Sequence, residues 1–112
     1  MIEQYGEWGR KGATLSEKSA CAEFGLTQDE IIDAVNAGKL QYRISSMHGN
    51  PWIRLLRREV EALVSTLRGE RYLKEKQAKA ELARVDLELK RLRTEVAALE
   101  ERRSNLTADL KA

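Results

Sequence analysis

A heptad repeat in the last third of the chain constrains its fold more than any other feature. Residues of its seam recur at alternating spacings of three and four: Leu82, Val85, Leu89, Leu92, Val96, Leu99, Arg103, Leu106 and Leu110. Neither Gly nor Pro occurs between Glu70 and Lys111. This pattern is typical of the a and d positions of a coiled coil. The sequence therefore predicts an uninterrupted coiled-coil oligomerisation helix over residues 70–112.

Such a helix needs a second helix against which to bury its apolar stripe. At 1.5 Å per residue it would extend about 60 Å, which is too long to pack on the rest of a 112-residue chain. We therefore expect a homodimer, and Arg103 in the seam is expected to limit oligomer order and fix register. In a parallel pair Glu88 would attract Arg93. Glu95 would repel Glu100 in the same pair, so both strand orientations stay open.

A short helix is predicted near the start of the chain, in the stretch TLSEKSACAEFG. Ser16 is a suitable N-cap, and a capping box between Thr14 and Glu17 is the alternative. Gly25 would end this helix. Its buried face would hold Ala20, Cys21 and Phe24.

The stretch LTQDEIIDAVNAGKL predicts a second helix. Thr27 and Glu30 have the spacing of a capping box, and Leu26 before the cap can pack on Ile31 as a hydrophobic staple. Gly38 would end the helix. The buried stripe would comprise Ile31, Ile32, Ala34 and Val35. Two short helices joined by a tight Gly-Leu-Thr turn are typical of a helix-turn-helix.

After Gly38 the apolar period changes to two. Leu40, Tyr42 and Ile44 alternate with polar residues, which predicts a half-buried strand. The stretch MHGNP predicts a turn, and WIRLL predicts a second strand that completes a β-hairpin. The stretch RREVEALVSTLRG predicts a third helix, with Gly69 as a weak point. The inner face of that helix would hold Val60, Leu63, Val64 and Leu67.

The first thirteen residues show no period. They could dock as an arm through Tyr5 and Trp8, and a frayed terminus is the alternative. The sequence thus predicts an N-terminal arm (1–13), a domain of two helices, hairpin and helix (14–69), and a coiled-coil helix (70–112). The expected fold class is mainly α with a small β-hairpin.

The order of the elements over residues 15–63 carries a family resemblance. The stretch LSEKSACAEFGLTQDEIIDAVNAGKL, followed by a hairpin ending in GNPWIRLLRREVEAL, resembles the winged helix-turn-helix of the excisionase and MerR-like group. The shared features are the opening Leu-Ser, the alanine-rich first helix, the Gly-Leu-Thr turn, GKL before the hairpin, and the closing Glu-Val-Glu-x-Leu. This resemblance implies binding of double-stranded DNA, with the second helix in the major groove and the hairpin as a wing.

The resemblance also implies which residues of the second helix face the bases: Gln28, Asp29, Ile32, Asp33 and Asn36. Among these, Gln28, Asp33 and Asn36 are the DNA-binding candidates. The acidic residues depart from the family, which usually has basic or hydroxyl residues after the cap. Glu30 would serve the cap and Asp29 the helix dipole. Asp33 could act on DNA only by accepting a hydrogen bond from cytosine.

The distribution of charge indicates the wing as the source of affinity. Residues 14–38 hold one basic and five acidic side chains, a net −4, and residues 39–69 hold six basic and two acidic, a net +4. Contacts from Lys and Arg to phosphates supply most nonspecific affinity for DNA. The candidates are Lys39, Arg43, His48, Asn50, Arg54, Arg57 and Arg58. A solvated basic face is the alternative, and Trp52 could either stack on a base or sugar or pack in the core.

Two other functions fit the same sequence. One is a DNA-packaging adaptor similar to the small subunits of phage terminases, which also join a winged head to an oligomerising helix. The other is a protein-interaction module, in which the acidic second helix faces a basic partner and the coiled coil is a scaffold.

Catalysis, metals and membranes have little support in the sequence. The chain has one cysteine and one histidine, Cys21 and His48, so we expect no enzyme activity, metal, cofactor or small-molecule ligand. No apolar run of about eighteen residues occurs, the first residues do not resemble a signal peptide, and a lone cysteine fits a reducing cytoplasm. The expected function is that of a dimeric DNA-binding protein, either a transcriptional regulator or an excisionase-like architectural factor.

Overall fold

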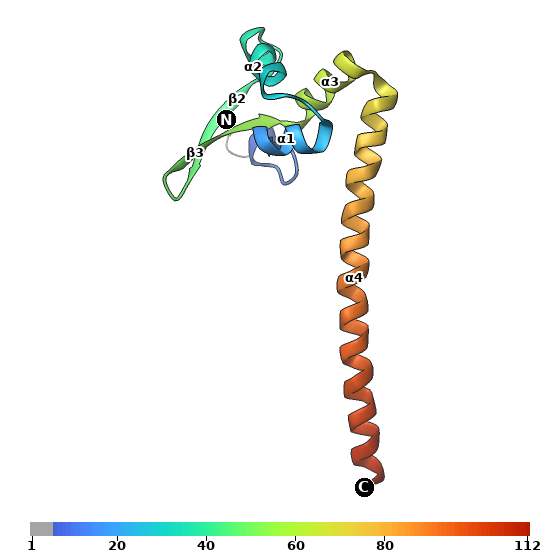
Figure 1. The fold of residues 1–112 in the computed structure, drawn as a ribbon. Coiled ribbons are helices and arrows are strands. Elements are labelled where there is room, and N and C mark those ends of the chain that lie inside the picture. Colours follow the sequence, from blue (N-terminus) through green and yellow to red (C-terminus); the bar gives the residue numbers. More distant parts are fainter. Residues whose placement is uncertain (1–5) are drawn as a thin grey trace. The chain divides into compact units, whose positions relative to one another are not determined.

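A computed structural model describes residues 6–112, which are mainly helical with one small antiparallel sheet (Figure 1). The elements are η2 (Glu7–Gly9), β1 (Thr14–Ser16), α1 (Glu17–Phe24), α2 (Gln28–Asn36), β2 (Tyr42–Met47), β3 (Asn50–Leu56), α3 (Arg57–Arg68) and α4 (Glu70–Lys111). The chain divides into two compact units, residues 1–77 and residues 78–112. None of the helices in the described residues is both long and apolar enough to cross a membrane.

The sheet has three strands rather than the two that the sequence predicts. β3 lies between β1 and β2, and both neighbours run antiparallel to it. β1 is only three residues long, so it has no alternation that the sequence could reveal. Because Thr14 lies in β1 and α1 begins after Ser16, Thr14 and Glu17 do not form a capping box. Instead the Ser16 hydroxyl caps α1 by accepting a hydrogen bond from the Ser19 amide at 3.0 Å, as the first alternative predicted.

The ends of α1 and α2 are as the sequence predicts. Gly25 ends α1 in the left-handed conformation, with φ of 71°. Thr27 and Glu30 form the predicted capping box: the Glu30 amide donates to Thr27 Oγ1 at 3.1 Å, and the Thr27 amide donates to Glu30 Oε1 at 2.9 Å. The backbone between the two helices is therefore fixed by local chemistry that can be read from the sequence.

The core of the first unit joins α1, α2, α3 and the start of α4 to the sheet. Its largest fully buried side chains are Phe24, Ile31, Leu55, Leu56, Val60 and Val64. Cys21 and Val35 are partly buried against this core. Two predicted core residues lie outside it, because Ile32 is 42% exposed and Leu67 is 47% exposed. Both stand at the margin of an apolar stripe, where the helical period alone does not fix how far the neighbouring elements reach.

The hairpin is longer and more exposed than predicted. A two-residue turn closes it, with positive φ at both His48 (54°) and Gly49 (83°), which is the conformation of a type I′ turn. Tyr42 is 51% exposed and Ile44 is 61% exposed, so the expected half-buried strand is wrong for both. Apolar and polar residues do alternate along the sequence here. However, β2 is an edge strand, and of Leu40, Tyr42 and Ile44 only Leu40, which precedes the strand, is buried in the core.

The first turns of α4 are part of the first unit. Gly69 separates α3 from α4 with φ of 92°. Leu73 is buried in the core, and the Tyr72 hydroxyl donates to the Phe24 carbonyl at 3.0 Å. A Cβ at Gly25 would lie 2.5 Å from that same hydroxyl, so this glycine is required twice, for its φ and for its closeness to Tyr72.

The second unit is the remainder of α4. The predicted uninterrupted helix is confirmed to Lys111. The apolar residues of the heptad seam are all exposed in the single chain. Its charged residues pair along the helix, for example Arg84 with Glu81 and Arg91 with both Glu88 and Glu95.

Arg68, at the end of α3, joins three parts of the first unit. Its guanidinium donates to the Glu30 carboxylate at 2.9 and 3.1 Å and to the Gly25 carbonyl at 3.1 Å. It also lies over the Tyr72 ring, 5.8 Å from the centroid. The hydrogen bonds from Arg68, followed by the backbone bond at Thr27, lower the pKa of Glu30 below its ordinary value of 4.5.

We expect Arg68→Gln to destabilise the protein more at pH 7 than at pH 3. A carboxyl whose folded pKa is lowered contributes stability above its unfolded pKa, and this contribution disappears as the pH falls through the folded value. The measurement is the difference in thermal midpoint between the parent and Arg68→Gln at each pH. A difference of the same size at both values would contradict a role of the Glu30 charge.

Candidate nucleic-acid interface

The outer face of α2 is the first part of the candidate interface. Five of its residues are exposed: Gln28, Asp29, Ile32, Asp33 and Asn36. These are the residues that the family resemblance assigns to the bases. Glu30 lies on the inner side, held by the capping box and by Arg68. One of the three acids on this helix thus has a structural role, and Asp29 and Asp33 remain on the outer face.

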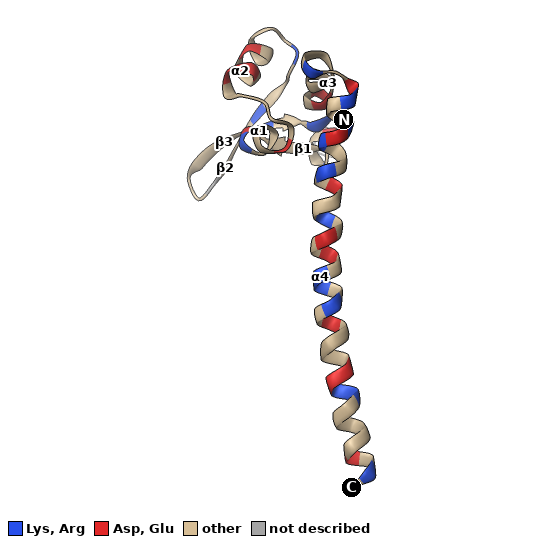
Figure 2. Ribbon diagram, turned by 45° about the vertical axis from the view of Figure 1, so that its right-hand side comes forward, with Lys and Arg blue, Asp and Glu red and all other residues tan. Residues whose placement is uncertain are grey.

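The hairpin is the second part, and it is free of acidic residues. Between Asp33 and Glu59 the chain carries no Asp or Glu and five Lys or Arg residues. Figure 2 shows acidic residues on α2 and none on the hairpin of β2 and β3. A protruding element without carboxylates can approach a phosphate backbone without like-charge repulsion.

Arg54 is tied to the N-terminal arm. Its guanidinium donates to the Trp8 carbonyl at 2.7 Å and to Thr14 Oγ1 at 3.3 Å, and it is partly buried. The Trp8 ring also lies against Arg43, whose guanidinium carbon is 4.7 Å from the ring centroid. The predicted docking of the arm is therefore confirmed for Trp8, whereas Tyr5 lies outside the described residues.

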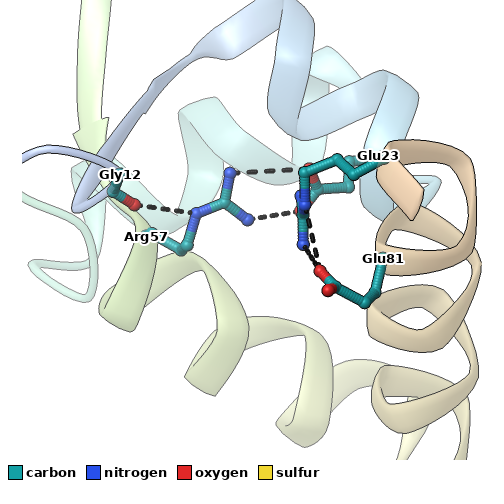
Figure 3. Close-up of polar contacts among 5 residues, drawn as sticks. Gly12, Glu23, Arg57 and Glu81 are labelled. Atoms are coloured by element: carbon teal, nitrogen blue, oxygen red, sulfur yellow. Dashed lines mark hydrogen bonds and ion pairs between the residues drawn. The ribbon is translucent and has the colours of Figure 1, made fainter. Parts of the chain in front are cut away.

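Arg57 and Arg58, at the start of α3, also have partners within the first unit. The Arg57 guanidinium donates to the Gly12 carbonyl at 3.1 Å and forms an ion pair with Glu23 (Figure 3). Arg58 makes two hydrogen bonds with the Glu7 carboxylate, at 3.0 and 2.9 Å, and these are the main cause of a lowered Glu7 pKa. These pairs join residues 34 and 51 positions apart, so no local pattern could have revealed them.

The other wing candidates are all exposed. Lys39 lies just before the hairpin, beside a shallow hollow that Arg58 and Glu59 also line. His48 and Asn50 stand at the tip. Arg43 is exposed, but it lies opposite Arg54 in the sheet and over the same Trp8 ring. Lys39, His48 and Asn50 thus point outward, Arg54, Arg57 and Arg58 hold the arm and α1 in place, and Arg43 is exposed but also contacts the arm.

An apolar groove between α2 and the hairpin was not anticipated from the sequence. Its volume is about 310 Å³, and it is lined mainly by Ile31, Ile32, Val35, Tyr42, Ile44 and Ile53, with Glu17 and Asn36. The exposed side chains of Ile32, Tyr42 and Ile44 therefore form one surface. The sequence contains these three apolar residues, but only the fold shows that they lie together on the surface.

The cysteine and the histidine of the chain lie in different surroundings. Cys21 packs against the core, and burial is the main cause of a raised pKa of its thiol, which makes the thiolate less available. His48 is at the exposed hairpin tip. Across residues 6–112, no group of three or more His, Cys, Asp or Glu side chains could hold a metal ion.

Comparison of the chain with known protein families, with curated proteins and with solved structures found no match.

Proposed function

We propose that the protein binds double-stranded DNA as a homodimer, through a winged helix-turn-helix in the first unit. The observation that carries this proposal is the acid-free hairpin beside α2, a helix that begins with a capping box and whose outer face is exposed. The order of β1, α1, α2, β2, β3 and α3, with a three-stranded sheet, supports the same arrangement. The resemblance of the sequence to the excisionase and MerR-like group also supports this proposal.

The proposal assigns different roles to the two groups of basic residues. Lys39 and Arg43 contact phosphates, and the hairpin tip approaches the minor groove or backbone. Arg54, Arg57 and Arg58 position the hairpin and α1 through their hydrogen bonds to the arm and their ion pair with α1. Arg43 also contacts the arm at Trp8, and it is assigned to a phosphate because it is exposed on the acid-free hairpin. This differs from the expectation that all five residues contact DNA.

The outer face of α2 supplies discrimination between sequences rather than affinity. Gln28 and Asn36 can each donate to and accept from a base edge. Asp33 can only accept, so it favours a cytosine amino group and disfavours phosphates. In this proposal the hairpin supplies affinity through its positive charge, and α2 supplies discrimination between sequences.

The second unit holds two chains together. Burial of the exposed seam against a second copy is the simplest use of an apolar stripe along an uninterrupted helix, in which Arg103 is the one charged seam position. Two DNA-binding units on one dimer gain affinity by avidity, because the second contact becomes intramolecular.

We expect Leu89→Lys to shift the chain toward the monomer and Arg103→Leu to strengthen self-association. The first places a charge in the apolar seam, and the second removes one. Leu87→Lys is the matched control, because Leu87 is an exposed apolar residue of α4 outside the seam. The measurement is sedimentation equilibrium, and equal effects of Leu89→Lys and Leu87→Lys would contradict the seam.

Binding to DNA is tested by the fluorescence anisotropy of a labelled duplex over a range of salt concentrations. We expect affinity to fall with salt, and Lys39→Ala and Arg43→Ala each to flatten the slope by about one unit. Arg54→Ala is expected to lower the thermal midpoint instead, because it releases the arm. Lys90→Ala, in α4, is the control for loss of one charge. Absence of binding by the parent at low salt would refute the proposed function.

A protein-interaction module is the second candidate, and the apolar groove favours it. The groove is bordered by α2, and residues 19–38 contain four acidic and no basic side chains. A basic partner with apolar side chains would match both features.

Asp33→Asn distinguishes the two candidates. If α2 lies near phosphates, removal of the carboxylate should strengthen binding to a duplex of random sequence, because one repulsive charge is lost. If α2 faces a protein partner, the affinity for DNA should not change. Anisotropy measured on the parent and Asp33→Asn at one low salt concentration decides between them.

A further inference from the structure

A second hollow lies at the tip of the hairpin, on residues that the proposed function does not fully use. It is open, with a volume of about 540 Å³, and it is lined by Ser16, Lys18, His48, Asn50, Pro51 and Trp52. None of these residues is acidic. The hollow combines one fixed positive charge, an imidazole, an amide, a hydroxyl and an apolar floor.

The fold brings Lys18 to the hairpin. Lys18 lies in the first turn of α1, whereas Trp52 is in β3, 34 positions further along the chain. Pairing of β1 with β3 sets this arrangement, because Ser16 is opposite Arg54 in the sheet and α1 begins directly after Ser16. The basic block of the sequence starts at Lys39, so this cation belongs to the candidate interface only through the tertiary structure.

The neighbouring acidic residue of α1 lies against another surface. Glu17 lines the apolar groove beside α2 and does not line the hollow at the hairpin tip. The start of α1 also carries the partial positive charge of its helix dipole. Lys18 is therefore the charged side chain of α1 that an anion in the hollow would meet.

Trp52 provides the apolar part of the hollow. Its side chain is 37% exposed, and Pro51 lies beside it in the lining. A partly exposed indole in the same lining as a cation suits a ligand that has an apolar ring close to a negative charge. The repeating unit of a DNA strand has this chemistry, with a deoxyribose ring attached to a phosphate.

We propose that this hollow holds one deoxyribose–phosphate unit of a bound duplex, with Lys18 against the phosphate and Trp52 against the sugar. His48 and Asn50 can form hydrogen bonds with the same DNA strand. This inference rests on the proposed function and adds Lys18 and Trp52 to its contacts. Such a contact positions the protein on the duplex and carries no sequence information.

The test uses the full chain with Trp8→Phe, so that Trp52 is the sole tryptophan. A duplex of random sequence and inorganic polyphosphate are titrated separately, and both the emission of Trp52 and the salt dependence of binding are measured. Lys18→Ala is compared with Lys111→Ala, which removes one charge at the end of α4. Thermal midpoints of all variants establish that they are folded.

We expect the duplex, and not polyphosphate, to change the emission of Trp52. Lys18→Ala should flatten the salt slope for the duplex by about 0.9 units, the value for one phosphate contact. Lys111→Ala should leave the slope unchanged. Together these results would support a site for sugar and phosphate.

Three results would overturn the inference while the duplex still binds. They are an unchanged slope in Lys18→Ala, an unchanged Trp52 emission at saturation, or an equal change with polyphosphate. The last would reduce the hollow to a nonspecific anion contact. Failure of the parent to bind duplex at low salt would refute the proposed function itself, and this inference with it.

Discussion

Glu30 and Arg68 together hold the first unit in its arrangement. Glu30 caps α2 through the Thr27 amide, and the same carboxylate accepts two hydrogen bonds from Arg68 at the end of α3. Arg68 in turn reaches the Gly25 carbonyl in the turn between α1 and α2. One local cap is thus joined to a long-range ion pair. The pair therefore links the turn, α2, the end of α3 and, through the Tyr72 ring, the start of α4.

The arginines near the hairpin show how the same residue type serves two purposes. Arg54, Arg57 and Arg58 each have oxygen partners within the first unit, so their charges orient the arm, α1 and the hairpin. The hairpin itself contains no carboxylate, so its outer side stays positive even after these charges are matched. A protein that positions its wing in this way can present a small number of outward cations at defined places.

Much of the fold could be predicted from the sequence because its signals are local. The caps at Ser16 and Thr27, the break at Gly69 and the uninterrupted helix α4 each depend on neighbours within one turn. The helical period predicted that Ile31, Ala34 and Val35 face inward, but it placed the exposed Ile32 with them. β1 could not be predicted, because three residues form a strand only by pairing with β3. The exposure of Ile44 could not be predicted either, because the alternation of apolar and polar residues does not show how far the helices that cover the sheet extend.

The sequence by itself therefore determined the four α-helices and their ends, because capping and periodicity act over a few residues. The tertiary structure decided which charges point outward. It paired Arg58 with Glu7 and Arg57 with Glu23, and it placed Lys18 beside Trp52 at the hairpin tip. The physical reason is that ion pairs and surfaces join residues far apart in the chain, and their partners are set only when the sheet and helices pack.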